Sequence, residues 1–143
     1  MVEDPTPGMH PKVLFVCVEN AGRSQIAAAL FRLASGGRGE ARSAGTRPAE
    51  RVHPHVAAAL ARRGIDVSTN RPRKLAIEDA EWADVVVTMG CGDECPVTGK
   101  PTEDWGLPDP KSMDPADLER LMGEIGARVT DLLDRVGRLA GSS

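Results

Sequence analysis

One unit near the start of the chain constrains the fold more than any other: an apolar run that ends at a cysteine and leads into a helical pattern. Residues 13–16 are Val, Leu, Phe and Val, which predicts a buried strand over residues 12–17. A helix is predicted over residues 24–35 and is closed by two glycines. The apolar positions of this helix are Ile26, Leu30 and Leu33. A strand that passes directly into a helix is typical of parallel α/β sheets.

The rest of the chain continues this alternation. The further strands are expected over residues 40–44 and 84–89, and the further helices from Pro54, over residues 76–82 and from Pro115. Asp114 is a suitable N-cap for the last helix, whose apolar stripe continues to Val136. This order predicts an α/β domain over residues 12–143, with a parallel sheet covered on both faces. Residues 1–11 are expected to form a flexible N-terminal arm.

Composition excludes several classes of function. A chain of 143 residues with 41% hydrophobic content can bury one ordinary core. The net charge of −3 gives no general attraction to nucleic acid or to an anionic membrane, and no apolar run is long enough to span a bilayer. Residues 1–11 are acidic and Pro-rich, unlike a secretory signal. Three cysteines in such a chain indicate reactive thiols in a reducing compartment. We therefore expect a cytoplasmic monomer.

Residues 90–113 are rich in Gly, Pro, Asp and Cys, and are expected to form one long loop. A loop of this length in a compact domain is usually functional. Because it follows a predicted strand, as Cys17 does, both should lie at the carboxyl edge of the sheet, where ligands of α/β proteins bind. Cys91 and Cys95 in this loop should therefore approach Cys17.

The turn after the first strand is suited to holding a tetrahedral oxyanion. The residues of this oxyanion cradle are Val18, Glu19, Asn20, Ala21, Gly22, Arg23 and Ser24. Free amides at the helix start can surround an anion, and the guanidinium of Arg23 matches two of its oxygens. The same positive environment favours the Cys17 thiolate, to which Ser24 can donate a hydrogen bond. The carboxylate of Glu19 is unfavourable beside an anion, so we expect it to point to solvent.

From about Lys12 to the last helix, the chain resembles the low-molecular-weight protein tyrosine phosphatase fold. This resemblance implies a three-layer α/β/α domain with a four-stranded parallel sheet. The resemblance rests on the cradle, on Ser-Ala-Gly-Thr at residues 43–46, on Gly-Ile-Asp at 64–66 and on Arg-Pro-Arg at 71–73. That fold hosts two chemistries, tyrosine dephosphorylation and thiol-dependent reduction of arsenate. Arsenate and phosphate have the same charge and nearly the same shape, and sulfate is an analogue of both. The cradle alone therefore does not indicate which of the two reactions the protein catalyses.

The resemblance also implies a general acid. Asp109, followed by Pro110, matches the Asp-Pro pair that protonates the departing oxygen in this family, and proline fixes the backbone beyond the carboxyl. Asp104 and Asp114 are the alternatives to Asp109. A simple structural role accounts for each of them, since Asp104 is interpreted as a loop charge and Asp114 as a helix cap.

The residues after this pair argue against a tyrosine phosphatase. In phosphatases of this fold, tyrosines that grip the phenol ring follow the Asp-Pro, whereas here Lys111 and Ser112 stand there. The chain contains no Tyr, and Trp105 alone is a poor replacement for an aromatic wall. Phosphatase activity is therefore the alternative function, and weak phosphatase activity is expected in either case.

Arsenate reduction needs two electrons, and hence a second thiol. Cys91 and Cys95 are similar to the redox segment of the thiol-coupled arsenate reductases of this fold, whose three cysteines relay a disulfide outward. The resemblance implies that Cys17 attacks arsenate, that Cys91 then releases arsenite, and that Cys95 forms a disulfide with Cys91. Thioredoxin would reduce that disulfide, and the cycle would serve arsenic detoxification. Residues four apart on a helical turn are close enough for a disulfide.

The short spacing of the last two cysteines leaves another reductant open. Thioredoxin-coupled enzymes space them further apart, and the segment also resembles reductases that use mycothiol and a mycoredoxin. In that case Cys91 and Cys95 would be partly dispensable.

Two other interpretations of the cysteines have less support. Zinc needs four ligands, and neither Cys17 nor any of the three histidines is spaced to complete a site with Cys91 and Cys95, so no bound metal is expected. A sensor that traps arsenite through the two cysteines would not need an oxyanion cradle.

The remaining polar candidates are assigned to structure. His53 and His55 flank a predicted helix start and are expected at the surface. Asn20 should hydrogen-bond within the cradle. A potassium ion there, which the family resemblance suggests, is doubtful because Ala28 stands where an acidic residue is expected. The basic residues 71–74 are expected to form a solvated turn.

Overall fold

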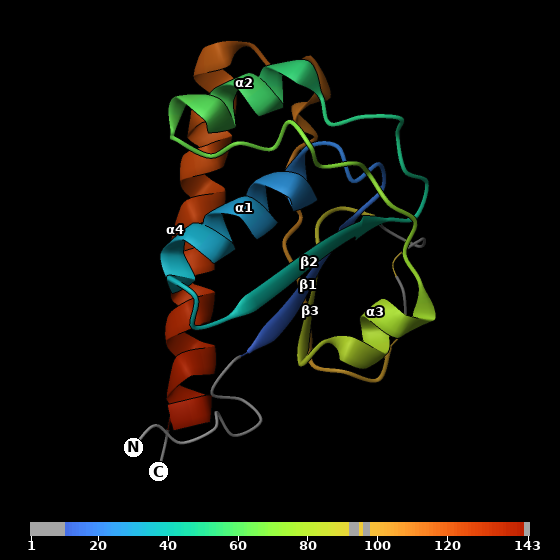
Figure 1. Cartoon of the computed structure of the whole chain (residues 1–143), viewed down its shortest axis with the longest axis vertical. Helices are drawn as coiled ribbons and strands as arrows, with labels where there is room; N and C mark the ends of the chain where they lie inside the picture. The colour runs from blue at the N-terminus through green and yellow to red at the C-terminus, as the bar shows by residue number, and fades with distance from the viewer. Residues whose placement is uncertain (1–10, 92–94, 96–97, 142–143) are drawn as a thin grey trace.

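A computed structural model describes residues 11–91, 95 and 98–141 of the chain (Figure 1). The alternation of strands and helices is as predicted. The strands are β1 (Lys12–Cys17), β2 (Glu40–Gly45), β3 (Val85–Thr88) and β4 (Thr102–Asp104). The helices are α1 (Arg23–Ser35), α2 (Pro54–Arg62), α3 (Ile77–Trp82) and α4 (Pro115–Gly141), with a short 3-10 helix η2 (Pro110–Ser112) before α4.

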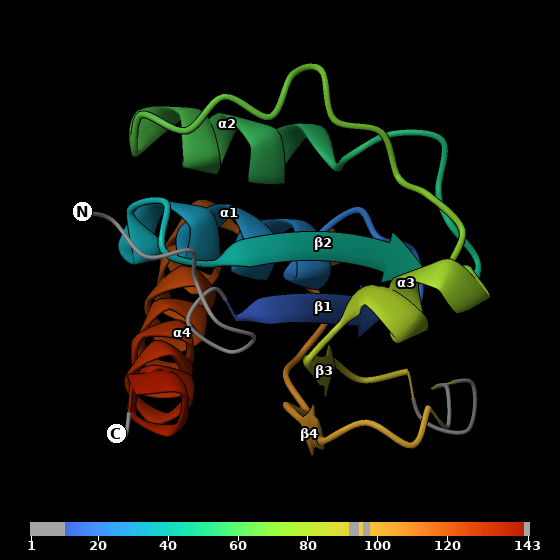
Figure 2. The ribbon, with the colours of Figure 1, turned by 60° about the horizontal axis from the view of Figure 1, so that its bottom comes forward.

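The four strands form one parallel sheet, which confirms the expected four-stranded parallel sheet, and their order is β2-β1-β3-β4 (Figure 2). Cys17 at the end of β1 lies opposite Gly45 at the end of β2, and Val16 lies opposite Thr88 at the end of β3. The turn after β1 and the loop after β3 therefore leave the sheet at the same edge.

Alternate residues of β1 face two different hydrophobic clusters. Val13, Phe15 and Cys17 pack with residues of α1, α2 and α4 on one face of the sheet. Leu14 and Val16 pack on the other face, with residues at the end of α3 and with Cys91. The helices accordingly form layers on both sides of the sheet (Figures 1 and 2). Burying each Val, Leu or Phe side chain completely stabilises the fold by about 1.5–3 kcal/mol relative to leaving it exposed.

Strand β4 lies within the segment predicted to be one continuous loop. Its residues are Thr, Glu and Asp, so no apolar alternation marks it in the sequence. It is a short strand at the edge of the sheet and pairs with β3. Trp105 extends this pairing, because its backbone N–H donates to the carbonyl of Thr88 at 2.7 Å. The strand depends on the partner beside it, and its own sequence pattern does not reveal it.

The predicted apolar face of α1 is correct except at its end. Ile26 and Leu30 are buried, but Leu33 is 64% exposed. The buried residues of α1 run continuously from Arg23 to Phe31, and the last turn passes beyond the core.

The C-terminus of α3 is capped by a lysine from a distant part of the chain. Nζ of Lys100 donates to the carbonyls of Ala80, Glu81 and Ala83 at 3.1, 3.0 and 2.6 Å. The last carbonyls of a helix have no partner within the helix, and a cation is favourable there. Lys100 thereby fixes the segment that enters β4 against α3.

The predicted arm, residues 1–11, lies outside the described residues except for Pro11, whose carbonyl accepts a hydrogen bond from the N–H of Glu40 at 2.9 Å. In the described part of the chain, no helix combines the length and apolar character that a bilayer crossing requires.

Candidate active site

Two donors converge on the sulfur of Cys17, which is buried at the end of β1. The N–H of Asn20 donates to Sγ at 3.2 Å, and Oγ of Ser24 lies 2.9 Å from Sγ. Nδ2 of Asn20 donates to Oγ of Ser24 at 2.7 Å, which leaves the serine hydroxyl hydrogen for the sulfur. The two contacts fix the position of the sulfur at the start of the cradle.

Asn20 organises the loop around this sulfur. Its backbone has φ +53°, a left-handed conformation that Asn tolerates better than most residues. Its Oδ1 accepts from the N–H of Arg73 at 3.0 Å and from Nε2 of Gln25 at 3.3 Å. The expected internal hydrogen bonding of Asn20 is therefore confirmed.

The carbonyls of the cradle are held by the segment that follows β2. Four of them, at Cys17, Val18, Glu19 and Ala21, accept hydrogen bonds of 2.8–3.2 Å from N–H groups of residues 46–53. Because these bonds occupy the acceptor side of the loop, they suit a cradle whose interior is made of N–H groups.

Arg23 is buried at the start of α1 and reaches toward the far side of the cradle. Its Nη1 donates to the carbonyl of Leu107 at 2.9 Å, and its Nη2 lies 3.9 Å from Oδ2 of Asp109. The structure thus brings together the two residues that sequence analysis assigned to oxyanion binding and proton donation.

Asp109 lies at the solvent-exposed edge of the site, beside Arg23, and its side chain is 51% exposed. Its Oδ1 accepts from the N–H of Lys111 at 3.0 Å, which opens η2. Pro110 lies directly on the cradle, because a Cβ at Gly22 would be only 2.6 Å from Cγ of Pro110. Only glycine at position 22 allows the acid segment to approach this closely.

Two histidines that sequence analysis placed at the surface belong to this site. Nε2 of His55 lies 2.7 Å from the carbonyl of Pro110, so it fixes the residue after the proposed acid. The side chain of His53 is only 13% exposed. The backbone N–H of His53 donates to the carbonyl of Ala21. The prediction was wrong because α2 begins against the cradle, a tertiary contact that a His-Pro-His sequence does not reveal.

Glu19 does not point to solvent as expected. Its two carboxylate oxygens lie 3.6 Å from Nε2 of His53 and 3.6 Å from Nζ of Lys111. Burial lowers the pKa of His53, although Glu19 and Asp109 oppose this shift. His53 is therefore uncharged at neutral pH, and Lys111 is the cation that balances Glu19. This pair ties the cradle to the segment that follows Asp109.

Cys91 and Cys95 are joined in a disulfide, with Cα atoms 5.1 Å apart, while Cys17 is a free thiol. Cys91 is buried in the hydrophobic cluster on the α3 face of the sheet, and Cys95 is partly buried against it. Cys17 packs in the cluster on the opposite face. The cysteines share one edge of the sheet but pack on different sides of it.

Gly90 links the redox segment to the cradle. It has φ +86°, and a Cβ there would collide with Nη1 of Arg23. Sequence analysis suggested only that Gly90 gives the loop freedom to move, and it did not predict this contact, because the contact is between segments far apart in the chain.

Trp105 is 3% exposed, with its ring 5.9 Å from that of Phe15, so it is a core residue and forms no wall for substrate. Arg73 is exposed, as expected for the turn, but it also donates to the carbonyl of Ser43 at 2.9 Å and pairs with Asp79 at 2.5 Å. Among the described residues, no three His, Cys, Asp or Glu side chains are grouped to hold a metal ion.

Comparison with known proteins agrees with this geometry. Residues 12–140 match the profile of the low molecular weight phosphotyrosine protein phosphatase family. A glutaredoxin arsenate reductase of Synechocystis sp. is 33% identical over 129 residues, which cover 87% of this chain and 98% of that protein. A solved structure of an arsenate reductase in its phosphate-binding state has a TM-score of 0.81 at 30% identity, covering 88% of this chain and 98% of that one.

A thioredoxin-dependent arsenate reductase of Corynebacterium glutamicum, also of known structure, has a TM-score of 0.77 at 41% identity. The match covers 89% of this chain but only 62% of the Corynebacterium chain, so part of that protein has no counterpart here. The family profile, the sheet topology and the cradle around Cys17 lead to one conclusion: the chain belongs to the low molecular weight phosphotyrosine protein phosphatase family.

Proposed function

We propose that this protein reduces arsenate to arsenite with electrons from its own cysteines. The observation that carries the proposal is a free Cys17 thiol within an oxyanion cradle, with a separate Cys91–Cys95 disulfide at the same edge of the sheet. A phosphatase needs the first feature only. The arsenate reductases among its relatives support the same reaction.

In the first step, arsenate occupies the cradle, held by loop amides and by Arg23. The Cys17 thiolate attacks arsenic, and one oxygen leaves as water after protonation by Asp109. The product is a covalent Cys17–arsenate adduct in which arsenic is still pentavalent. The contacts of Pro110 with Gly22 and His55 support the assignment of Asp109, since they hold its backbone over the cradle.

The second step transfers the electrons. The Cys91 thiolate attacks Sγ of Cys17, the sulfur–arsenic bond breaks with its electron pair on arsenic, and arsenite leaves. Cys95 then attacks Sγ of Cys91, which forms the Cys91–Cys95 disulfide and releases Cys17 as a thiolate. The disulfide in the structure corresponds to this last state. In the reduced state Cys91 has to leave the α3 face of the sheet to reach Cys17.

The cycle closes when an external dithiol reduces the disulfide, and we propose a thioredoxin as that reductant. The Corynebacterium relative is described as thioredoxin-dependent. Mycothiol with a mycoredoxin would replace both steps of the relay and would make the disulfide unnecessary. Weak hydrolysis of phosphate monoesters is expected as a side reaction, because the cradle and the acid are shared by both chemistries.

We further propose that the protein works in the cytoplasm as a monomer, with residues 12–143 as its single folded domain and residues 1–11 as an arm. A reducing compartment supports this proposal because it would keep Cys17 available as a thiol.

The test is arsenate-dependent oxidation of NADPH in the presence of thioredoxin and thioredoxin reductase. Wild type should turn over, whereas Cys91→Ser and Cys95→Ser should each stop after the step they block. With arsenate alone, Cys95→Ser should accumulate a Cys17–Cys91 disulfide that peptide mass mapping detects. Cys91→Ser should form no disulfide.

The outcomes separate the candidates. Turnover of both variants with mycothiol and a mycoredoxin would replace the relay with the external-thiol mechanism. Hydrolysis of aryl phosphate at enzymatic rates, without any arsenate-dependent NADPH use, would establish a phosphatase and overturn the proposal.

A further inference from the structure

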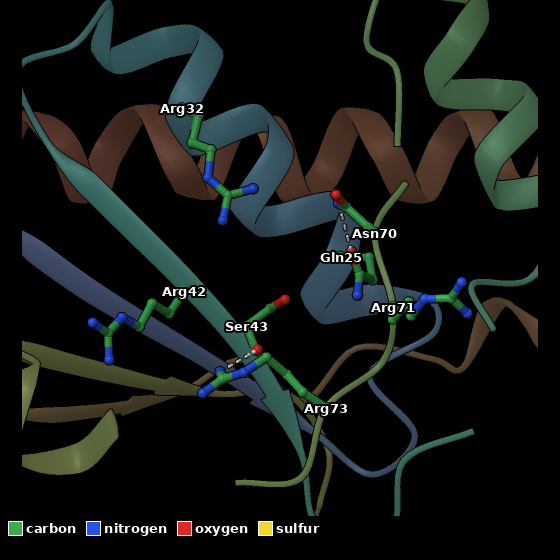
Figure 3. A pocket seen from close by; sticks show the side chains of 7 residues that line it. All are labelled: Gln25, Arg32, Arg42, Ser43, Asn70, Arg71 and Arg73. Atoms are coloured by element: carbon green, nitrogen blue, oxygen red, sulfur yellow. Dashed lines mark hydrogen bonds between the residues drawn. The ribbon is translucent and has the colours of Figure 1, made fainter. Parts of the chain in front are cut away.

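A polar cavity lies between α1, β2 and residues 70–73 (Figure 3). Its volume is about 310 Å³, and four of its seven lining residues are arginines: Arg32, Arg42, Arg71 and Arg73. Figure 3 shows that they come from α1, from β2 and from residues 70–73, and that the side chain of Arg71 points away from the other three. No step of the proposed reaction uses this cavity.

The positive charge of the cavity is only partly balanced. The buried carboxylate of Asp79 pairs with Arg42 at 3.3 Å and with Arg73 at 2.5 Å. Among the residues that the structure describes, neither Arg32 nor Arg71 has a carboxylate within 4 Å. One carboxylate thus pairs with two of the four guanidinium groups, and in the described part of the chain the other two have no carboxylate partner.

Arg32 has no acidic partner among the described residues. Its Nη2 donates to the carbonyl of Ala41 at 2.8 Å, a neutral acceptor. The residue is exposed overall, and partial burial lowers its pKa. A bound anion would supply the missing negative charge and would accept further hydrogen bonds from the guanidinium.

We propose that this cavity binds a doubly charged tetrahedral oxyanion at a site separate from the catalytic cradle. Guanidinium groups present paired donors that match such an oxyanion, and the amide of Gln25 and Ser43 line the same space. The volume exceeds that of a single tetrahedral anion and reaches the lower end of small-ligand sites. The ligand is therefore either a free inorganic anion or the phosphate group of a small monoester.

The cavity is connected to the catalytic loop by three hydrogen bonds. Nε2 of Gln25 donates to the carbonyl of Asn20 at 3.0 Å and to its Oδ1 at 3.3 Å, and the N–H of Arg73 donates to the same Oδ1 at 3.0 Å. Because both amide hydrogens of Gln25 are used in these bonds, the guanidinium groups would hold the anion. An anion beside Arg73 would stabilise the segment that holds Asn20.

The experiment must exclude binding in the cradle itself. With the Cys91–Cys95 disulfide intact, iodoacetamide can alkylate only Cys17, which fills the cradle with a covalent group. Inorganic sulfate and glycerol phosphate are then titrated separately into this protein, and amide chemical shifts are followed by NMR. Saturable shifts at Gln25, Ser43 and Asn70 are expected, with a stoichiometry of one anion per chain.

Variants locate the site. Arg32→Gln/Arg71→Gln should weaken binding by about tenfold, as the loss of charge-assisted hydrogen bonds predicts. Arg120→Gln/Arg128→Gln removes the same charge from the exposed surface of α4 and should leave binding unchanged. The exposed Arg71→Gln alone, which cannot disturb the core, should weaken binding by a smaller factor.

Tighter binding of glycerol phosphate than of sulfate would identify a phosphate monoester as the ligand, and the reverse would identify a free anion. The proposal is overturned if neither probe gives saturable shifts at these residues. It is equally overturned if both arginine pairs weaken binding to the same extent, because that result reports net charge only.

Discussion

The cradle and the redox segment meet at one edge of the sheet but are built in opposite ways. In the cradle, the sulfur of Cys17 and the side chains of Asn20 and Ser24 are buried and joined by hydrogen bonds. In the redox segment, Cys91 is held by a disulfide and by apolar packing on the α3 face.

This difference separates two tasks. The group that holds the oxyanion is fixed before substrate arrives, so little reorganisation is needed when charge develops on it. The second thiol has to move from one side of the sheet to the other, and apolar packing can be remade in a new position more readily than a network of buried hydrogen bonds. A fixed holder beside a movable reductant is what the proposed relay requires.

The largest expected effect comes from removing the nucleophile. Cys17→Ser should lower arsenate reduction by at least about 10³-fold, because a serine hydroxyl is a far weaker nucleophile than a thiolate. Arsenate should no longer oxidise Cys91 and Cys95, whereas diamide should still form their disulfide. Disulfide formation driven by arsenate in this variant would show that the two regions do not act in sequence.

The contact between the two regions is tested at Gly90. Gly90→Ala places a Cβ against Arg23 and strains a backbone with φ +86°, so turnover should fall roughly 10- to 100-fold through a displaced guanidinium. Gly99→Ala is the matched control, since Gly99 has φ +76° and no heavy atom lies within 4 Å of the place a Cβ would take. Equal losses in both variants would attribute the effect to backbone strain and not to Arg23.

The rigidity of the cradle is tested at Asn20. Asn20→Ala leaves the N–H of Arg73 without its acceptor and removes the longer of the two hydrogen bonds that Nε2 of Gln25 donates, which costs about 1–3 kcal/mol. We expect roughly a tenfold loss of turnover with a lower urea midpoint. Asn70→Ala, which removes only one part-buried side-chain hydrogen bond to Gln25, should change both quantities much less. A comparable loss at Asn70 would show that the loop is not held through Asn20.

The smallest effect concerns the wall of the cradle at His53. Because burial lowers its pKa from 6.5, the unfolded chain binds a proton at His53 more readily than the folded protein does. Stability from this residue is therefore complete above about pH 6.5 and is lost as the pH falls below it. Urea midpoints measured between pH 7.5 and 5.5 should decline more steeply for wild type than for His53→Gln. Parallel curves would show that His53 is not buried as described.

The fold was largely predictable because its main elements carry local signals. Residues 13–17 are apolar throughout, and α4 has both an N-cap and a continuous stripe. Strand β4 could not be predicted, since its three polar residues are ordered by β3 beside them and not by their own pattern.

The same division applies to the site. Cys17 and the residues up to Ser24 are contiguous, so one stretch of sequence specifies their arrangement. The positions of Glu19, His53 and Gly90 depend on contacts across long sequence separations. Their side chains are polar or absent, and such residues are compatible with either an exposed loop or a packed wall.

The cap that Lys100 places on α3 has a consequence for the relay. Residues 89–99 are attached at one end to β3, through Thr88, and at the other to α3, through Lys100. A thiol on a short closed segment has an effective concentration on the order of millimolar or more at a neighbouring site. Free thiols in the cell would have to match that concentration to reach the Cys17 adduct first. The choice between the relay and an external thiol thus becomes a kinetic competition, in which a lysine outside the cradle favours the protein's own cysteine.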